Sequence, residues 1–282
     1  METILLNYGK IKIYIKFKIM KELFFLTLIF VILFILFKKK YNANLYSRFK
    51  YKFENKTLLT PLKLVDQIYC IVMPDRKDDM IKFMKQLNVN CKFLNAVTPK
   101  DLTEDDYKHL TKNELFKTTK KTRLPLQISF CVCYLDAIEN GYNDIIVFED
   151  DVKINTDTET LKQSIDEFRK SQYAMFYMGY CYLNCKQDFK SDSLLVNVND
   201  YDKMYCAHSI VYKVKYLKSL VNYLFPMKDE FDVGLVKYNE SHHNKLCIPK
   251  KVYFEQNKTL GTNNETLNPD GSFTPDPPTC LI

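Results

Sequence analysis

Tryptophan is absent from this chain and glycine is scarce. Only six of the 282 residues are glycine, and none of them forms a GxGxxG turn or a glycine-rich phosphate loop. No internal repeat is present either, which excludes repeat architectures. What remains is an ordinary globular composition, 46% hydrophobic and 27% charged. The length suits one large domain or two small ones.

The nine cysteines lack the spacing of a zinc site, because no second paired cluster completes one. Several lie in apolar runs, where a buried free thiol is the commoner explanation. The net charge of +7 comes from lysines spread along the whole chain. A nucleic-acid surface would gather them with aromatic residues, so no nucleic-acid partner is expected.

One apolar run, Leu23–Phe37, is broken only by Thr27 and is flanked by lysines. It is shorter than the ~17–25 residues of most membrane helices. It is apolar on every side, which disfavours a core helix, and no small residues mark a cleavage site at its end. We therefore predict an uncleaved, single-pass membrane anchor. The lysine bias slightly favours a cytoplasmic N-terminus, which makes the globular part lumenal in a eukaryotic-type secretory context.

Five segments are expected along the chain. They are a basic N-terminal segment 1–22, the anchor 23–37, a stem 38–63, a globular domain 64–260 and an irregular tail 261–282.

The most informative stretch is a buried strand that ends in carboxylates. Four apolar residues, Ile145 to Phe148, precede Glu149, Asp150 and Asp151. Side chains alternate along a strand, so Glu149 and Asp151 are expected to point one way and Asp150 the other. Their mutual repulsion favours a divalent cation, and oxygen ligands suit Mg²⁺ or Mn²⁺. The alternative is a solvated acidic turn after a core strand.

Strands and helices alternate through the globular part, which predicts an α/β sandwich. The opening is strand–helix–strand and implies a parallel pair of strands. The expected strands are 67–73, 91–95, 144–149, 173–178, 194–198, 205–212 and 251–255. The expected helices are 77–87, 102–116, 127–140, 158–170 and 214–224.

These pieces resemble the family 25 glycosyltransferases, which include lipopolysaccharide-type and procollagen galactosyltransferases. The resemblance spans about Gln67 to Gln256 and rests on short motifs in the family's order. The motifs are the turn with Arg76, Phe93 to Val97, Ala137 to Glu139 before the Glu149–Val152 acidic strand end, Met175 to Gly179, Ala207 to Val211, Asp232 to Leu235, and Gln256. The resemblance implies a fold of glycosyltransferase type A, with a Rossmann-like mixed sheet flanked by helices.

Three features depart from the family pattern. Phe130 stands after Ser129 where the family usually has His, and Pro125-Leu126 replace a Gly-Cys pair. A second Arg that usually follows the first turn is also missing, since Asp78-Asp79 occupy that region.

The resemblance implies a UDP-sugar donor, a glycan or protein hydroxyl acceptor, Mn²⁺ or Mg²⁺, and inversion at the anomeric carbon. Asp151 and Glu149 are the predicted metal ligands, with His208 a further candidate whose place on an apolar strand favours a core role. Arg76, Glu149 and Asp150 are predicted to contact the sugar nucleotide. Asp232 is the predicted general base, with Asp229 the second candidate.

Two other functions stay open at this point. An inactive relative could bind or scaffold with the same fold, a reading that Phe130 favours and the retained carboxylates oppose. A metal-dependent nuclease or nucleotidyltransferase could use the same acidic cluster, although an anchor would be unusual for it.

Overall fold

The computed structural model describes residues 20–29, 31–32, 45–58, 60–180, 182–183, 194–198, 204–242 and 245–257. The chain divides into two compact units, Met1–Arg48 and Phe49–Ile282. In the first unit, residues 20–29 and 31–32 are helical. Part of the predicted anchor and all of the predicted tail lie outside the described residues. Along the described ranges, no helix combines the length and apolar character needed to cross a bilayer.

The second unit opens with the predicted parallel pair. Strand β2 (Gln67–Val72) leads through a short 3-10 turn, η2 (Pro74–Arg76), into helix α2 (Lys77–Leu87) and then strand β3 (Cys91–Asn95). The helix ends because Asn88 takes a left-handed conformation with φ of 54°. Strands β2 and β3 then pair in parallel, as predicted.

An eight-stranded mixed sheet forms the centre of this unit, in the order β1-β3-β2-β4-β10-β6-β11-β8. Its other strands are β1 (Phe53–Lys56), β4 (Asp144–Glu149), β6 (Tyr173–Tyr177), β8 (Leu195–Asn197), β10 (Ser209–Lys213) and β11 (Lys245–Pro249). Strand β10 runs antiparallel to both β4 and β6. Two small sheets join β5 (Val152–Ile154) to β12 (Phe254–Gln256), and β7 (Tyr182–Leu183) to β9 (Met204–Tyr205).

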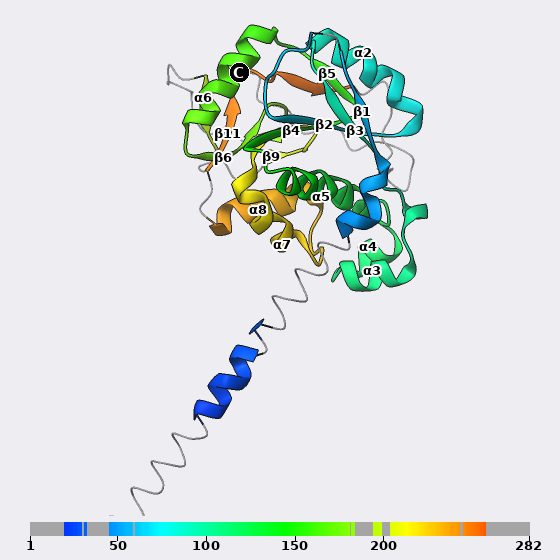
Figure 1. Cartoon of the computed structure of the whole chain (residues 1–282), viewed down its shortest axis with the longest axis vertical. Helices are drawn as coiled ribbons and strands as arrows, with labels where there is room; N and C mark the ends of the chain where they lie inside the picture. The colour runs from blue at the N-terminus through cyan, green and yellow to red at the C-terminus, as the bar shows by residue number, and fades with distance from the viewer. Residues whose placement is uncertain are drawn as a thin grey trace, which may run out of the picture. The chain divides into compact units, whose positions relative to one another are not determined.

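Helices cover both faces of the large sheet, with α2 and α6 on one side and α5, α7 and α8 on the other (Figure 1). The remaining helices are α3 (Glu104–Leu110), α4 (Glu114–Thr118), α5 (Arg123–Glu139), α6 (Thr158–Lys170), α7 (Leu217–Leu224) and α8 (Phe231–His242), with 3-10 turns η1 (Lys50–Lys52), η3 (Pro99–Asp101) and η4 (Val214–Tyr216). The predicted mixed α/β sheet flanked by helices is confirmed.

Alternation along β4 decides which side chains face which helices. Ile146 and Phe148 belong to the apolar core shared with α2 and α6. Val147 pairs with Tyr69 of β2, whose hydroxyl donates to Asp136 of α5 at 2.5 Å. Glu149, two residues after Val147, therefore lies on the α5 side of the sheet.

Several local predictions differ from the structure, and the single helix expected over 102–116 is in fact two helices, α3 and α4. The expected elements include neither helix α8, whose first turn holds Asp232, nor strand β11, which follows that helix. The single strand expected over 205–212 is split, because Cys206 takes a left-handed φ of 73° between β9 and β10. Strand β1, within the expected stem, pairs with β3 at the sheet edge.

Candidate active site

Asp150 ties the end of β4 to the turn after β2. Its Oδ2 accepts a hydrogen bond from the Met73 backbone N–H at 2.6 Å, and its Oδ1 accepts one from Arg76 Nη1 at 3.0 Å. The side chains of Asp150 and Arg76 are largely buried, with exposed fractions of 11% and 10%. Burial raises the pKa of Asp150, while the bonds from Met73 and Arg76 oppose that rise. Arg76, predicted to contact the nucleotide, thus also holds the acidic turn in place.

Glu149 lies at the last position of β4, where its backbone N–H bonds the His208 carbonyl at 2.9 Å. Burial raises the pKa of its carboxyl well above the ordinary value, and Asp151, Asp150 and Asp232 raise it further. A carboxyl surrounded in this way stays negatively charged only if a cation compensates it, and otherwise it takes up a proton and is neutral.

Asp151 has one satisfied and one unsatisfied oxygen. Its Oδ2 accepts from Gln256 Nε2 at 3.3 Å, whereas its Oδ1 is buried with no hydrogen-bond partner among the described residues. Burial raises the pKa of Asp151 to about 6, Asp150 adds to the rise and Arg76 opposes it. A buried carboxylate oxygen without a donor is a position that a cation or a bound proton would satisfy.

Asp232 comes from a distant part of the chain to this cluster. It lies in the first turn of α8, where the Val233 N–H bonds its Oδ1 at 2.8 Å and the Cys206 N–H bonds its Oδ2 at 3.3 Å. Burial raises its pKa, and the two backbone bonds work against that rise. Cys206 is itself disulfide-bonded. Two fixed backbone donors therefore orient the carboxylate that sequence analysis predicted as the general base.

Asp229, the second candidate base, has a different environment. It forms an ion pair with Lys237 Nζ at 2.7 Å, and its side chain is 32% exposed. A carboxylate neutralised by a partly exposed lysine is typical of a protein surface.

His208 is packed as a core residue. Its ring is 1% exposed, and its Nε2 lies 3.1 Å from the Phe254 carbonyl oxygen. A carbonyl only accepts, so Nε2 carries the proton, and Nδ1 has no hydrogen-bond partner in the described part of the chain. Burial lowers the pKa of His208 to about 4, so the ring is neutral. Gly179 leaves no room for a Cβ beside this ring and Phe254.

The residues present suit a cation bound by carboxylates more than one bound by histidine. Glu149 and Asp151 supply hard oxygen donors, of which Asp151 Oδ1 is unsatisfied. Within the described ranges no group of three or more His, Cys, Asp and Glu side chains is arranged to hold a metal ion. Any cation here would therefore complete its coordination with water or with oxygens of a bound ligand.

Arg123 is a site residue that the sequence reasoning missed. It begins α5, its Nε lies 3.9 Å from Glu230 Oε1, and its charge lowers the pKa values of both Glu149 and Asp232. The sequence pattern predicts a helix that starts only at Gln127, which leaves Arg123 outside it. Pro125 in fact lies in the first turn of α5, where proline is tolerated because no helical donor is needed there.

Phe130, the departure from the family pattern, is fully buried in α5 and stacks on Phe231 with ring centroids 4.2 Å apart. Its neighbour Ser129 bridges two elements: its Oγ accepts from the Val97 N–H at 2.9 Å and donates to the Pro125 carbonyl at 2.9 Å. The region where the motif is altered is therefore closely packed.

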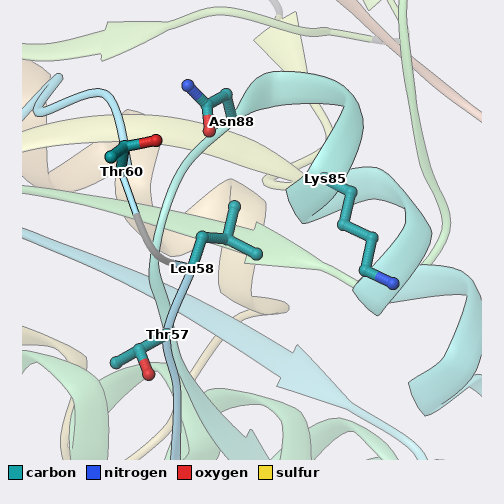
Figure 2. A pocket seen from close by; sticks show the side chains of 5 residues that line it. All are labelled: Thr57, Leu58, Thr60, Lys85 and Asn88. Atoms are coloured by element: carbon teal, nitrogen blue, oxygen red, sulfur yellow. The ribbon is translucent and has the colours of Figure 1, made fainter.

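A surface pocket of about 420 Å³ lies away from these residues. Figure 2 shows its walls, which come from the segment after β1 and from the end of α2: Thr57, Leu58, Thr60, Lys85 and Asn88. Helix α2 runs back from the carboxyl end of β2, so its last turn lies at the opposite edge of the sheet from the acidic cluster. None of the candidate site residues lines this pocket.

A mixed sheet between helices, with carboxylates at the carboxyl end of a central strand, defines an α/β enzyme with its site at that edge. The chain belongs to glycosyltransferase family 25 (LPS biosynthesis protein), whose family model matches residues 68–248. It is thus a sugar-transferring enzyme of that family. The matched region contains Arg76, Glu149, Asp150, Asp151, Asp232 and the other predicted site residues. A search of curated proteins gave no match to the chain.

Proposed function

We propose that this enzyme transfers a hexose from a UDP-sugar to a hydroxyl of a glycan or protein acceptor, with inversion and with Mn²⁺ or Mg²⁺ as cofactor. Membership of glycosyltransferase family 25 shows that the enzyme transfers a sugar. The observation that supports the finer statement is the buried group of Glu149, Asp151 and Asp232, in which every carboxyl has a raised pKa. The same arrangement supports a fold of glycosyltransferase type A.

Glu149 and Asp151 would hold the cation, which when bound neutralises the charge on the leaving diphosphate. Asp150 contributes indirectly, because its bonds to Met73 and Arg76 fix the turn that carries Asp151. Gln256 restrains Asp151 from the other side, through its bond to Oδ2. The acidic turn and one oxygen of Asp151 are thus held in place before any ligand binds, which is the condition for electrostatic stabilisation.

Asp232 would take the proton from the acceptor hydroxyl. Its raised pKa makes it a better base than an exposed carboxylate, because a stronger base accepts the proton more readily at neutral pH. Its two backbone donors keep it ionised enough to act and hold it in one orientation. Removal of the proton as the hydroxyl attacks the anomeric carbon, opposite the leaving diphosphate, gives inversion.

A donor panel tests this proposal. We expect UDP release from one or more UDP-sugars that requires Mn²⁺ or Mg²⁺ and that Asp151→Asn abolishes, while the surface variant Asp166→Asn retains it. Cation-independent release, or equal activity of the two variants, would contradict the cation proposal. Cleavage of nucleic acid in place of sugar transfer would point to the nuclease alternative.

We also propose that Leu23–Phe37 attaches the enzyme to a membrane, on the basis of its apolar run and flanking lysines. The full-length protein should stay in the pellet after carbonate extraction. A soluble product starting near residue 40 would mean that the run is a cleaved signal.

A further inference from the structure

Two aromatic rings join α5 to the start of α8. Phe130 and Phe231 stack with their centroids 4.2 Å apart and their planes at 27°. Both side chains are buried, Phe130 completely and Phe231 with 4% exposed. Phe231 directly precedes Asp232, so the position of this ring and the position of the candidate base are linked through one peptide unit.

Helix α5 also holds the chain on either side of this stack. Gln127 Nε2 donates to the Leu224 carbonyl at 2.7 Å, at the end of α7. Ahead of α5, Lys120 Nζ bonds Glu230 Oε1 at 2.6 Å. The chain that leads into α8 therefore rests on α5 through a buried hydrogen bond and the ring stack, and on the turn before α5 through an ion pair.

The first turn of α8 has little stability of its own. Its sequence contains Val233 and Gly234, which disfavour helix. The helical bonding begins with the Gly234 N–H donating to the Glu230 carbonyl at 2.8 Å. Such a turn takes its place from tertiary packing, and the Phe231 ring is the buried side chain nearest Asp232 in sequence.

We propose that Phe130 is a positioning residue for catalysis: its stack on Phe231 fixes the first turn of α8 and so aims the Asp232 carboxylate. The inference rests on the proposed role of Asp232 as the base. Phe130 has no polar atom and acts only through packing. With Phe130 in place of the family's usual His, the enzyme is then active, and the ring stack sets the position of the base.

Phe130→Leu tests this, because it keeps an apolar side chain but removes the ring. A misplaced base lowers turnover, and a displacement of about 1 Å can cost ~10²-fold. We expect kcat to fall about 10- to 100-fold, with the KM for the donor changed less than about twofold, because the donor is held at Glu149 and Asp151. Phe231→Leu should give the same split, and the double variant should lose little more than either single one.

Phe168→Leu is the matched control. Phe168 is also fully buried and packs on Phe176 at 5.9 Å, on the α6 side of the sheet. It should lower the melting temperature as much as Phe130→Leu and leave kcat per folded molecule near the wild-type value. Equal kcat for Phe130→Leu and Phe168→Leu would overturn the inference. So would a rise in donor KM with unchanged kcat.

Asp232→Asn separates this inference from the proposed function beneath it. If Asp232→Asn alone leaves kcat unchanged, the base assignment fails. If it lowers kcat, adding Phe130→Leu should cause no further loss, because the base that Phe130 aims is already gone. A further full loss in that background would show that Phe130 acts elsewhere. Should Phe130→Leu fail to fold, Phe231→Leu and Phe231→Met carry the same comparison from the other ring.

Discussion

The two ends of strand β4 carry carboxylates of similar chemistry in opposite circumstances. At the amino end, Asp144 accepts from the Asp66 N–H at 3.0 Å and from the Arg169 guanidinium through both oxygens. At the carboxyl end, Asp151 has one buried oxygen without a partner, and Glu149 has acidic neighbours that raise its pKa.

This contrast separates carboxylates that stabilise the fold from carboxylates that are placed to bind a ligand. Asp144 is paired with the guanidinium of Arg169. Asp136 is paired in the same way, because Lys92 Nζ donates to its two oxygens at 2.8 and 2.7 Å. Buried carboxylates are normally paired in this way, because an unpaired buried charge is costly. The free-energy cost of burying Glu149 and Asp151 falls at the edge of the sheet where ligands bind. Buried carboxylates at such an edge are typical of a functional site.

The largest expected effect is on turnover. Asp232→Asn removes the proposed base while keeping the shape of the side chain, so kcat should fall by ~10²–10⁴-fold. Donor affinity should hardly change. Steady-state kinetics measure both, with Asp229→Asn as the control, because Asp229 is paired with Lys237. If donor affinity falls as much as turnover, Asp232 belongs to the donor or cation site instead.

The amino end of β4 should respond in stability rather than activity. Asp144→Asn leaves Arg169 without its buried partner, and because Arg169 is 35% exposed the cost should be about 2 kcal/mol, below that of a fully buried pair. Denaturant unfolding measures this cost. Activity per folded molecule should stay at the wild-type level. A large loss of kcat without loss of stability would erase the distinction between the two ends.

Acid should weaken cation binding at the carboxyl end of β4. The pKa of Asp151 is raised to about 6, so its carboxylate is protonated as the pH falls through that value. Cation-dependent donor binding should weaken below about pH 6, because ligands must be deprotonated to bind a metal. For a raised acidic pKa, the ligand-free protein gains stability as the pH falls from 7 towards the unfolded value. Calorimetry at several pH values should show both the weaker donor binding and the greater stability of the ligand-free protein. In Asp151→Asn the contribution of this residue to each change should be absent.

The smallest effect is expected at His208. His208→Gln should change the affinity for Mn²⁺ by less than about twofold, because the buried neutral ring serves packing against Gly179 and Phe254. Its melting temperature should nevertheless fall. A strong loss of Mn²⁺ affinity in a folded variant would restore His208 as a metal ligand.

Sequence reasoning located the acidic strand end and most of the sheet, because the apolar run before Glu149 and the opening strand–helix–strand are local patterns. It could not locate the surroundings of Asp232. Helix α8 forms through packing of Phe231, Leu235 and Tyr238 rather than through helix propensity, and no local pattern reports that. The Phe130–Phe231 stack joins distant segments, so it too is visible only in the folded chain.

The central claim is that the carboxyl end of β4 binds the catalytic cation through Glu149 and Asp151. Titration of Mn²⁺ in the presence of UDP, by calorimetry on wild type, Asp151→Asn and Asp144→Asn, tests it most directly. Wild type and Asp144→Asn should bind Mn²⁺, and a folded Asp151→Asn should bind none. Unchanged Mn²⁺ affinity in Asp151→Asn would contradict it.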